Sequence, residues 1–335
     1  MNTFRFLTVV ALAVGAACAA PSRSDEHLGS ASEKIVFGTD SDESQDAVVL
    51  VMHYDALLAG GDTTGCTGTM LTPKLVLTAR HCVAVTDESA ACSDQGPLAG
   101  GVVYQDRPAS KLYAFSGKTR PDFLSGKATY AKGAALIDDG ANTLCNHDIA
   151  LIVLEKPLEG TKIAPVRLES GPKKDEVVTL VGWGITDKSP TPNTRQQRTG
   201  VTVTELGKAE FRVTEGACSG DSGGPALSSQ GAVLGVLSRG GVAGGEAGAA
   251  GCVGSGNEYT SLVAFKDLVL SAYDKAGQPA WLEGEPDPTA APPAAEDARA
   301  SGCTVGRAPC AGSRWAAAVL VALGMVRRRG SKRIA

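Results

Sequence analysis

The sequence predicts an all-β fold with a helix near its C-terminal end, and three observations support this class. Glycine is abundant, with 41 residues in a chain of 335, which favours a fold rich in tight turns. Short apolar runs recur, such as VVLVMHYD at 48–55 and IALIVL at 149–154, and such runs are typical of buried strands. The stretch AFKDLVLSAYDKAG at 264–277 instead has helical periodicity, because its apolar residues fall near one face.

Composition and charge describe a globular protein without an electrostatic sign of nucleic-acid binding. Hydrophobic residues make up 43% of the chain and charged residues 20%, as in packed domains. A length of 335 residues accommodates one large domain or two small ones. The formal net charge of −4 gives no basic excess to attract phosphate groups, so no nucleic acid is expected as a partner.

The N-terminal segment at 1–20 is predicted to be a secretory signal peptide. A single positive charge at Arg5 precedes an apolar run at 6–17, and small residues follow. Cleavage at the end of this segment fits the preference for small residues. Cys18 leaves a second interpretation open, in which the exported protein is lipidated at this cysteine.

The C-terminal part is predicted to hold a linker and a sorting tag. Residues 277–301 are rich in proline, alanine and acidic residues, which indicates an extended spacer. In 302–335 an apolar run at 315–326 is followed by three arginines, and this tag resembles the C-terminal sorting tags of myxobacterial-type surface proteins. A transmembrane helix and a sorting or processing peptidase are expected there. The 12-residue run is shorter than the roughly 20 residues of a spanning helix, so an ordinary amphipathic or core helix is the alternative.

The cysteines predict a disulfide framework in an exported protein. Of nine cysteines, one lies in the predicted signal peptide and two in the predicted tag. Six cysteines form an even set, which favours disulfides and allows 15 pairings. Zinc is disfavoured because no C-x₂-C motif accompanies the four histidines, so no metal and no cofactor are expected. The six are Cys66, Cys82, Cys92, Cys145, Cys218 and Cys252.

Three separated stretches carry candidate catalytic groups: VLTARHCV at 76–83, CNHDIALIVL at 145–154 and CSGDSGGP at 218–225. Asp148 precedes a buried strand, where a carboxylate needs a partner, and an imidazole is a suitable one. His81 is the candidate base, although a lone histidine is more often structural. His147 is the alternative partner, but adjacent strand residues point to opposite faces. Ser222 lies among glycines and needs such a base to become a nucleophile.

These motifs in the order His, Asp, Ser resemble those of the trypsin/chymotrypsin-like serine protease family. The resemblance rests on TARHC, HDIAL, GDSGGP and the further VGWG, and it covers about 35–276. It implies two antiparallel β-barrels with the active site in the cleft between them. It also implies that His81 is the general base and acid, that Asp148 orients it and that Ser222 is the nucleophile. The N–H groups of Gly220 and Ser222 would form the oxyanion hole.

The resemblance also implies disulfide pairs and a zymogen. Cys66–Cys82 and Cys218–Cys252 match family disulfides, which leaves Cys92–Cys145 as the remaining pair. Cleavage after Lys34 would free the α-amino group of Ile35 to pair with buried Asp221, and 21–34 would be a propeptide. Phe37 stands where the family usually has glycine, and a solvated Glu33–Lys34 pair is the alternative interpretation.

Substrate preference is predicted from the residues around the serine. Gly216 stands where family members specific for basic residues have an aspartate, so a small or apolar residue is expected before the scissile bond (P1). Ser238 and Gly240 flank Arg239 in the segment expected to bind substrate backbone, and Arg239 replaces a frequent aromatic residue. Either of two acidic residues further along the chain, Glu246 or Glu258, would instead restore a basic preference.

The expected function is a serine endopeptidase that is secreted or attached to the bacterial cell surface. Its expected partners are protein or peptide substrates and an activating protease. A catalytically inactive, protease-like binding protein is the alternative. The spacing of 67 residues between His81 and Asp148 is long for the family, and the extra residues, near 84–135, are expected to form surface loops.

Overall fold

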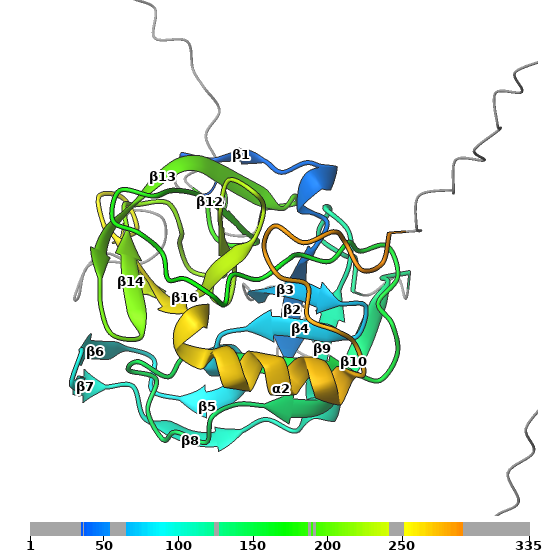
Figure 1. The fold of residues 1–335 in the computed structure, drawn as a ribbon, viewed down its shortest axis with the longest axis horizontal. Helices are drawn as coiled ribbons and strands as arrows, with labels where there is room; N and C mark the ends of the chain where they lie inside the picture. Colours follow the sequence, from blue (N-terminus) through cyan, green and yellow to red (C-terminus); the bar gives the residue numbers. More distant parts are fainter. Residues whose placement is uncertain are drawn as a thin grey trace, which may run out of the picture. The chain divides into compact units, whose positions relative to one another are not determined.

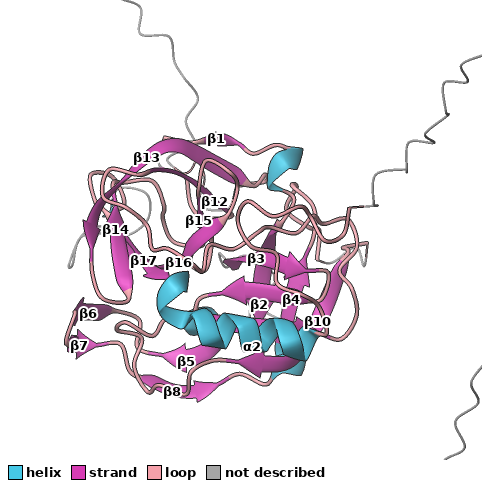
Figure 2. Ribbon diagram, in the orientation of Figure 1, coloured by secondary structure: helices cyan, strands magenta, loops and turns pink. Residues whose placement is uncertain are grey.

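The computed structural model describes residues 35, 37–53, 65–123, 127–186, 189, 192–240 and 251–290. Strands make up most of the regular structure in this part of the chain (Figure 2). The predicted all-β fold of two antiparallel barrels with a C-terminal helix is confirmed. The predicted signal peptide at 1–20 and propeptide at 21–34, Lys34 included, lie outside the described residues.

The first barrel consists of six antiparallel strands in the closed order β10-β11-β4-β3-β2-β9. Its strands are β2 (Val48–His53), β3 (Cys66–Thr72), β4 (Leu75–Thr78), β9 (Leu112–Phe115), β10 (Tyr130–Ile137) and β11 (Ala150–Leu154). The runs read as buried strands in the sequence, β2 and β11, are buried at nearly every position. Val49, Val76 and Ile152 belong to one apolar cluster of this barrel, so burial of β-branched side chains explains why these runs form strands.

The second barrel closes because β13 pairs with both β12 and β14, in the order β13-β12-β15-β16-β17-β14. Its strands are β12 (Val177–Gly182), β13 (Gln196–Leu206), β14 (Glu210–Val213), β15 (Pro225–Leu227), β16 (Val233–Gly240) and β17 (Asn257–Ser261), and β1 (Thr39–Asp40) pairs with the outer edge of β13. A separate cluster that includes Leu180, Val203 and Phe211 belongs to this barrel. A third cluster joins residues of both barrels with residues of the C-terminal helix.

The extra residues between His81 and Asp148 form two short ribbons and two barrel strands, with the connections between them. The ribbons are β5 (Ala84–Thr86) with β8 (Val103–Asp106) and β6 (Ala90–Ser93) with β7 (Gly96–Gly100). The later part of the predicted surface loops contains β9 and β10, which belong to the first barrel. The expectation of surface loops therefore holds for the ribbons alone, because β9 and β10 are needed to close the barrel. Short 3₁₀ helices lie at η1 (Glu43–Gln45), η2 (Arg80–Cys82), η3 (Ala109–Lys111) and η5 (Leu262–Phe265).

The C-terminal helix α2 (Lys266–Ala276) runs alongside the first barrel and ends at Gly277, whose φ of 70° suits glycine (Figure 1). The chain does not leave the domain there. The Val166 N–H donates to the Trp281 carbonyl, and the Val166 carbonyl accepts from the Glu283 N–H. The Glu283 carboxylate also pairs with Arg167 at 2.5 Å. Leu282 packs against the apolar cluster shared by both barrels. The first part of the predicted linker at 277–301 is thus bound to the barrels, and 291–301 lies outside the described residues.

The prediction of a transmembrane helix is corrected by the structure. No helix in the described ranges is both long and apolar enough to cross a membrane. The segment at 302–335, for which that helix was predicted, lies outside those ranges. Its apolar run of 12 residues is also well short of the roughly 20 that a spanning helix needs.

Candidate active site

His81 lies in η2, directly after β4, and its backbone position is held by a disulfide. The neighbouring Cys82 is bonded to Cys66 at the start of β3. The imidazole Nδ1 lies 2.8 Å from Oδ2 of Asp148, and the His81 backbone N–H donates to Oδ1 at 3.0 Å. Because both carboxylate oxygens bind the same residue, the ring and the backbone of His81 are oriented together. The side chain of His81 is 22% exposed and that of Asp148 only 1%.

Asp148 precedes β11 and receives a further hydrogen bond from the second barrel. The Ser238 hydroxyl on β16 donates to Oδ2 at 2.7 Å, and the Asp148 carbonyl accepts from the Thr260 hydroxyl at 3.0 Å. Burial raises the pKa of the Asp148 carboxyl, but the charge and hydrogen bonds of His81 and Ser238 outweigh burial and hold that pKa below its usual value.

The electrostatic effect on His81 is reciprocal. Burial disfavours the protonated imidazole, but the adjacent Asp148 carboxylate outweighs burial and raises the pKa of His81 above its usual value. The alternative partner, His147, instead lies with its Nδ1 2.5 Å from Asp139. The structure therefore pairs Asp148 with His81, as the resemblance implied.

Ser222 lies in the turn between β14 and β15, next to the segment that carries His81. Its carbonyl accepts from the backbone N–H of Thr67 at 2.8 Å, and Sγ of Cys82 lies 3.5 Å from the same carbonyl. The Thr67 hydroxyl donates to the Gly220 carbonyl at 2.9 Å. Thr67 on β3 thus ties the serine turn of the second barrel to the first barrel. Sequence reasoning missed Thr67, because nothing in CTGT marks its role.

The turn around Ser222 depends on glycine. Gly223 has a φ of 78°, and a Cβ there would lie 2.1 Å from the Thr78 hydroxyl oxygen. Gly220 also adopts a positive φ, 97°. The Asp221 N–H donates to the Cys218 carbonyl at 3.0 Å, which closes the turn. The Cys218–Cys252 disulfide joins this turn to the segment before β17.

Asp221 is almost completely buried at 2% exposure, and its carboxylate lies against Gly182 and Gly184 of VGWG. Its carboxylate accepts from the backbone N–H groups of Gly184 at 2.7 Å and Cys218 at 2.9 Å. No charged side chain among the described residues pairs with it. Burial therefore outweighs these two hydrogen bonds and raises the pKa of Asp221 to about 7.

Two residues that follow the predicted cleavage site have unfavourable backbone angles. Ile35 is fully buried with a φ of 51°, and Phe37 is 41% exposed with a φ of 65°. Positive φ angles are unfavourable for β-branched and bulky side chains. Phe37 therefore occupies a conformation that suits glycine, which is the residue expected there from the resemblance.

A model of the trypsin family matches residues 36–252, which is more than half of the chain. The chain belongs to the trypsin family. It is 30% identical over 162 residues to chymotrypsin-2 of Vespa crabro, covering 43% of this chain and 70% of that protein. It is 26% identical over 230 residues to the snake venom serine protease Haly-2 of Gloydius brevicauda, covering 63% of this chain and 78% of that protein.

Solved structures share the fold of this trypsin-family chain. Neuropsin, a serine protease expressed in the limbic system of mouse brain, has a TM-score of 0.50 at 18% identity, covering 71% of this chain and 99% of that one. A mutant of human heparin binding protein has a TM-score of 0.53 at 15% identity, covering 71% of this chain and 96% of that one. The described residues contain three disulfides, among them Cys92–Cys145, and these indicate an extracellular protein.

Beside the residues predicted to bind substrate in this trypsin-family chain lies a residue that sequence analysis did not single out. Asn257 at the start of β17 is fully buried, and its side-chain amide binds both the N–H and the C=O of Ala217 at 3.0 Å. A Cβ at Gly240 would lie 2.3 Å from Nδ2 of Asn257. Asn257 thus fills the space between Gly240 and the segment that follows Gly216. Pairing of β16 with β17 sets Gly240 opposite Asn257, so no local motif could reveal this contact.

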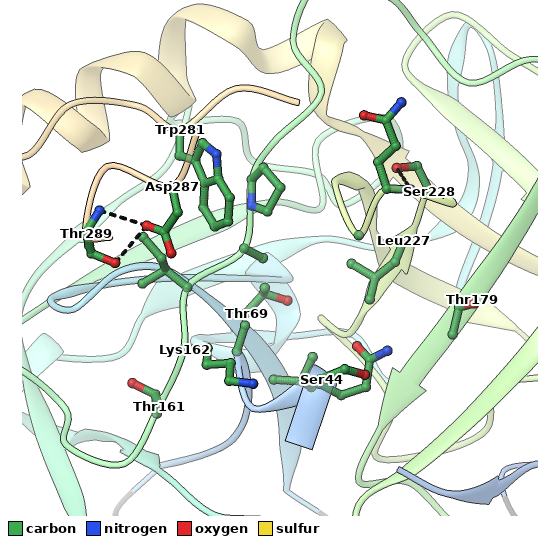
Figure 3. Close-up of a pocket in the computed structure, with 18 of the residues that line it drawn as sticks. Ser44, Thr69, Thr161, Lys162, Thr179, Leu227, Ser228, Trp281, Asp287 and Thr289 are labelled. Atoms are coloured by element: carbon green, nitrogen blue, oxygen red, sulfur yellow. Dashed lines mark hydrogen bonds between the residues drawn. The ribbon is translucent and has the colours of Figure 1, made fainter. Parts of the chain in front are cut away.

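The described residues contain one cluster of possible metal ligands, Cys66, His81 and Cys82. Its two cysteines are joined in a disulfide and supply no thiolate. A cavity of about 640 Å³ is lined instead by residues of both barrels and of the C-terminal segment, including Thr69, Lys162 and Trp281 (Figure 3). None of the predicted site residues lines this cavity.

Proposed function

We propose that this trypsin-family chain is a serine endopeptidase with Ser222 as nucleophile, His81 as general base and acid, and Asp148 as the group that orients His81. The observation that carries the proposal is the pairing of His81 with Asp148 beside a turn whose Ser222 carbonyl is bonded to the first barrel. A serine hydroxyl needs a base to remove its proton, and a base is most effective when its tautomer is held.

The proposed reaction follows from these positions. Asp148 holds the proton of His81 on Nδ1, so Nε2 is free to accept the proton of the Ser222 hydroxyl as its oxygen attacks the scissile carbonyl. Nε2 then gives that proton to the departing amine, and an acyl-enzyme remains on Ser222. A water molecule repeats the sequence and releases the acid. The N–H groups of Gly220 and Ser222 would stabilise the negative oxygen in both steps.

A zymogen is proposed from Asp221 and the strained residues near the N-terminal cleavage site. An α-amino group freed at Ile35 by cleavage after Lys34 would supply the cation that the buried Asp221 carboxylate lacks. The positive φ angles of Ile35 and Phe37 would be released by the same cleavage. Cleavage would separate Lys34 from Ile35. The ion pair between the new Ile35 α-amino group and Asp221 would then hold the turn that contains Gly220.

A small or apolar P1 residue is proposed because no described residue offers an unpaired carboxylate beside Gly216 or Gly240, and Asn257 fills the space next to Gly240. The alternative Glu246 lies outside the described residues. Gly216 is buried against Leu180, and Glu258 is already paired with Arg212 at 2.9 Å. In Asn257→Gly, hydrolysis of substrates with P1 phenylalanine relative to alanine should rise by about tenfold, because the pocket deepens. Ser229→Ala, at an exposed turn position, is the control and should leave this ratio unchanged. A wild-type preference for P1 lysine or arginine would contradict the proposal.

Export and processing are proposed from the sequence. A signal peptide at 1–20 would direct secretion, a propeptide at 21–34 would precede the protease domain, and the tag at 302–335 would be processed by a sorting peptidase for surface attachment. Protein or peptide substrates and a separate activating protease are the proposed partners. The activating protease is required because an enzyme that prefers small or apolar P1 residues would not cut after Lys34. Cleavage of Ser222→Ala precursor at Lys34 by the active wild type would refute this point.

Labelling by a fluorophosphonate tests the central proposal. Protein processed to an Ile35 N-terminus should be labelled and should hydrolyse casein, whereas processed Ser222→Ala should do neither. Absence of both in wild type with the verified N-terminus would favour the inactive binding protein.

A further inference from the structure

An ion pair lies next to the proposed triad, at a place where the trypsin-like resemblance leads one to expect an aromatic residue. Arg239 on β16 binds Glu210 on β14 through both terminal nitrogens, with Nη1 2.7 Å from Oε1 and Nη2 2.5 Å from Oε2. The side chains are 22% and 8% exposed. A two-point pair of this kind fixes the planes of both groups.

This pair contacts the neighbourhood of Asp148 from two directions. Oε1 of Glu210 also accepts from the backbone N–H of Asn146 at 3.0 Å, two residues before Asp148. Nη1 of Arg239 lies 3.4 Å from the Ser238 hydroxyl, which in turn donates to Oδ2 of Asp148 at 2.7 Å. One carboxylate therefore holds the backbone that carries Asp148, and the arginine holds the hydroxyl that binds it.

The conformation of Asn146 explains why the Asp148 segment needs such a support. Asn146 has a φ of 65°, in the left-handed region. Its side chain donates to the Ser93 carbonyl at 2.8 Å. The β6–β7 ribbon therefore holds the side chain of Asn146, and Glu210 holds its backbone. The neighbouring Cys145 is bonded to Cys92 on that ribbon.

Further charged groups lie near the pair on the neighbouring strands. Glu258 on β17 lies opposite Arg239 in the sheet register and pairs with Arg212 on β14 at 2.9 Å. Glu205 on β13 adds negative charge near Glu258. Arg239 also lies within electrostatic reach of Asp148. It is thus a cation that acts on both the Glu210 and the Asp148 carboxylates.

We propose that Glu210 and Arg239 are positioning residues for the triad: the pair holds the Asp148 turn through Asn146 and the Asp148 carboxylate through Ser238, and Arg239 offsets the repulsion between the two carboxylates. The inference rests on the proposed function, in which Asp148 orients His81. It predicts that the two charges of the pair act on His81 in opposite senses. Loss of the Arg239 cation favours protonated His81, and loss of the Glu210 anion disfavours it.

The test is an NMR titration of the His81 imidazole in the processed Ser222→Ala protein, with the His81 signal assigned by its absence in His81→Ala. Arg239→Gln should raise the pKa of His81, and Glu210→Gln should lower it, each by on the order of half a unit. The double variant should return it to the starting value. Glu169→Gln, which removes one carboxylate of the exposed Lys266–Glu169 pair, is the matched control and should not move it.

Kinetics of the same variants in the active protein separate charge from geometry. Arg239→Lys keeps the cation but loses the two-point contact, so kcat should fall about tenfold while the acid limb of the kcat/KM profile stays in place. In Arg239→Gln that limb should move to higher pH, and in Glu210→Gln to lower pH. A merely structural pair would lower kcat at every pH without moving the limb.

These measurements distinguish a positioning role of the Glu210–Arg239 pair from a merely structural one. Equal or absent shifts of the His81 pKa in the two Gln variants would overturn the inference, as would full kcat in Arg239→Lys. If a Gln variant does not fold, Arg239→Lys and Glu210→Asp carry the test through kcat, with thermal unfolding to verify the fold. An unlabelled, inactive wild type would instead refute the proposed function, and the NMR arm would still report on the pair.

Discussion

Asp148 and Asp221 are both nearly inaccessible to solvent, yet their surroundings are opposite in kind. Asp148 receives two hydrogen bonds from His81 and one from Ser238, and its pKa is held below the usual value. Asp221 receives two backbone hydrogen bonds, and its pKa is raised to about 7. Among the residues that the structure describes, Asp148 therefore has its partners in place, whereas Asp221 has no cation beside it. This difference is the basis of the proposed activation by cleavage.

The largest effect should come from the complete site. Asp148→Asn should lower kcat/KM about 10⁴-fold at neutral pH, because the amide would favour the wrong tautomer of His81. The measurement is steady-state hydrolysis of a peptide substrate by the processed enzyme. Asp267→Asn, at an exposed position in the first turn of α2, is the control and should be unchanged. Retention of more than a tenth of the activity by Asp148→Asn would remove Asp148 from the proposed triad.

A smaller loss is expected at the incomplete site. Asp221→Asn should reduce kcat/KM by about 10²–10³-fold after cleavage, because an amide cannot hold the new α-amino group and the turn with Gly220 loses its support. The uncleaved precursors of wild type and variant should be equally inactive. If the processed variant kept wild-type activity, Asp221 would have no part in activation.

The raised pKa of Asp221 predicts a pH-dependent stability in the uncleaved chain. The carboxyl titrates near 3.8 in the unfolded chain and near 7 in the folded one, so between these values the folded state binds more protons. The free energy of unfolding should therefore fall as pH rises from 4 to 7, by up to about 4 kcal/mol, and its Asp221 contribution should be constant above that range.

Urea unfolding of uncleaved Ser222→Ala, with and without Asp221→Asn, measures this contribution as a difference. Asp221→Asn should remove the fall in the free energy of unfolding between pH 4 and 7. Cleavage after Lys34 should also remove it, since the α-amino group would stabilise the ionised form. Identical pH profiles with and without Asp221→Asn would contradict the assignment.

The smallest expected effect tests how much of the Asp148 site depends on a single donor. Ser238→Ala removes one of three hydrogen bonds to the carboxylate and should lower kcat/KM about tenfold. Ser229→Ala, at an exposed turn position, is the matched control. A loss as large as that of Asp148→Asn would mean that Ser238 acts in some further way.

Much of the fold and the candidate site was accessible to sequence reasoning because it depends on local pattern. The apolar runs at β2 and β11 are strands, and the periodic stretch before Gly277 is a helix. His81 and Asp148 were named from their motifs and lie in contact, while their roles and that of Ser222 stay predictions. The linker expected at 277–301 was judged by composition, which does not register that Leu282 and Glu283 have specific partners.

The sequence by itself determined the fold class, the even set of cysteines and the identity of the candidate catalytic groups, because periodicity and motifs act over a few neighbouring residues. Tertiary structure alone decided which groups surround them. Arg239 meets Glu210 across 29 positions, Ala217 meets Asn257 across 40, and Ser238 meets Asp148 across 90. Such contacts depend on strand register, including the irregularity between Leu237 and Arg239 in the pairing of β16 with β17. A one-residue change in register would turn these side chains to the opposite face.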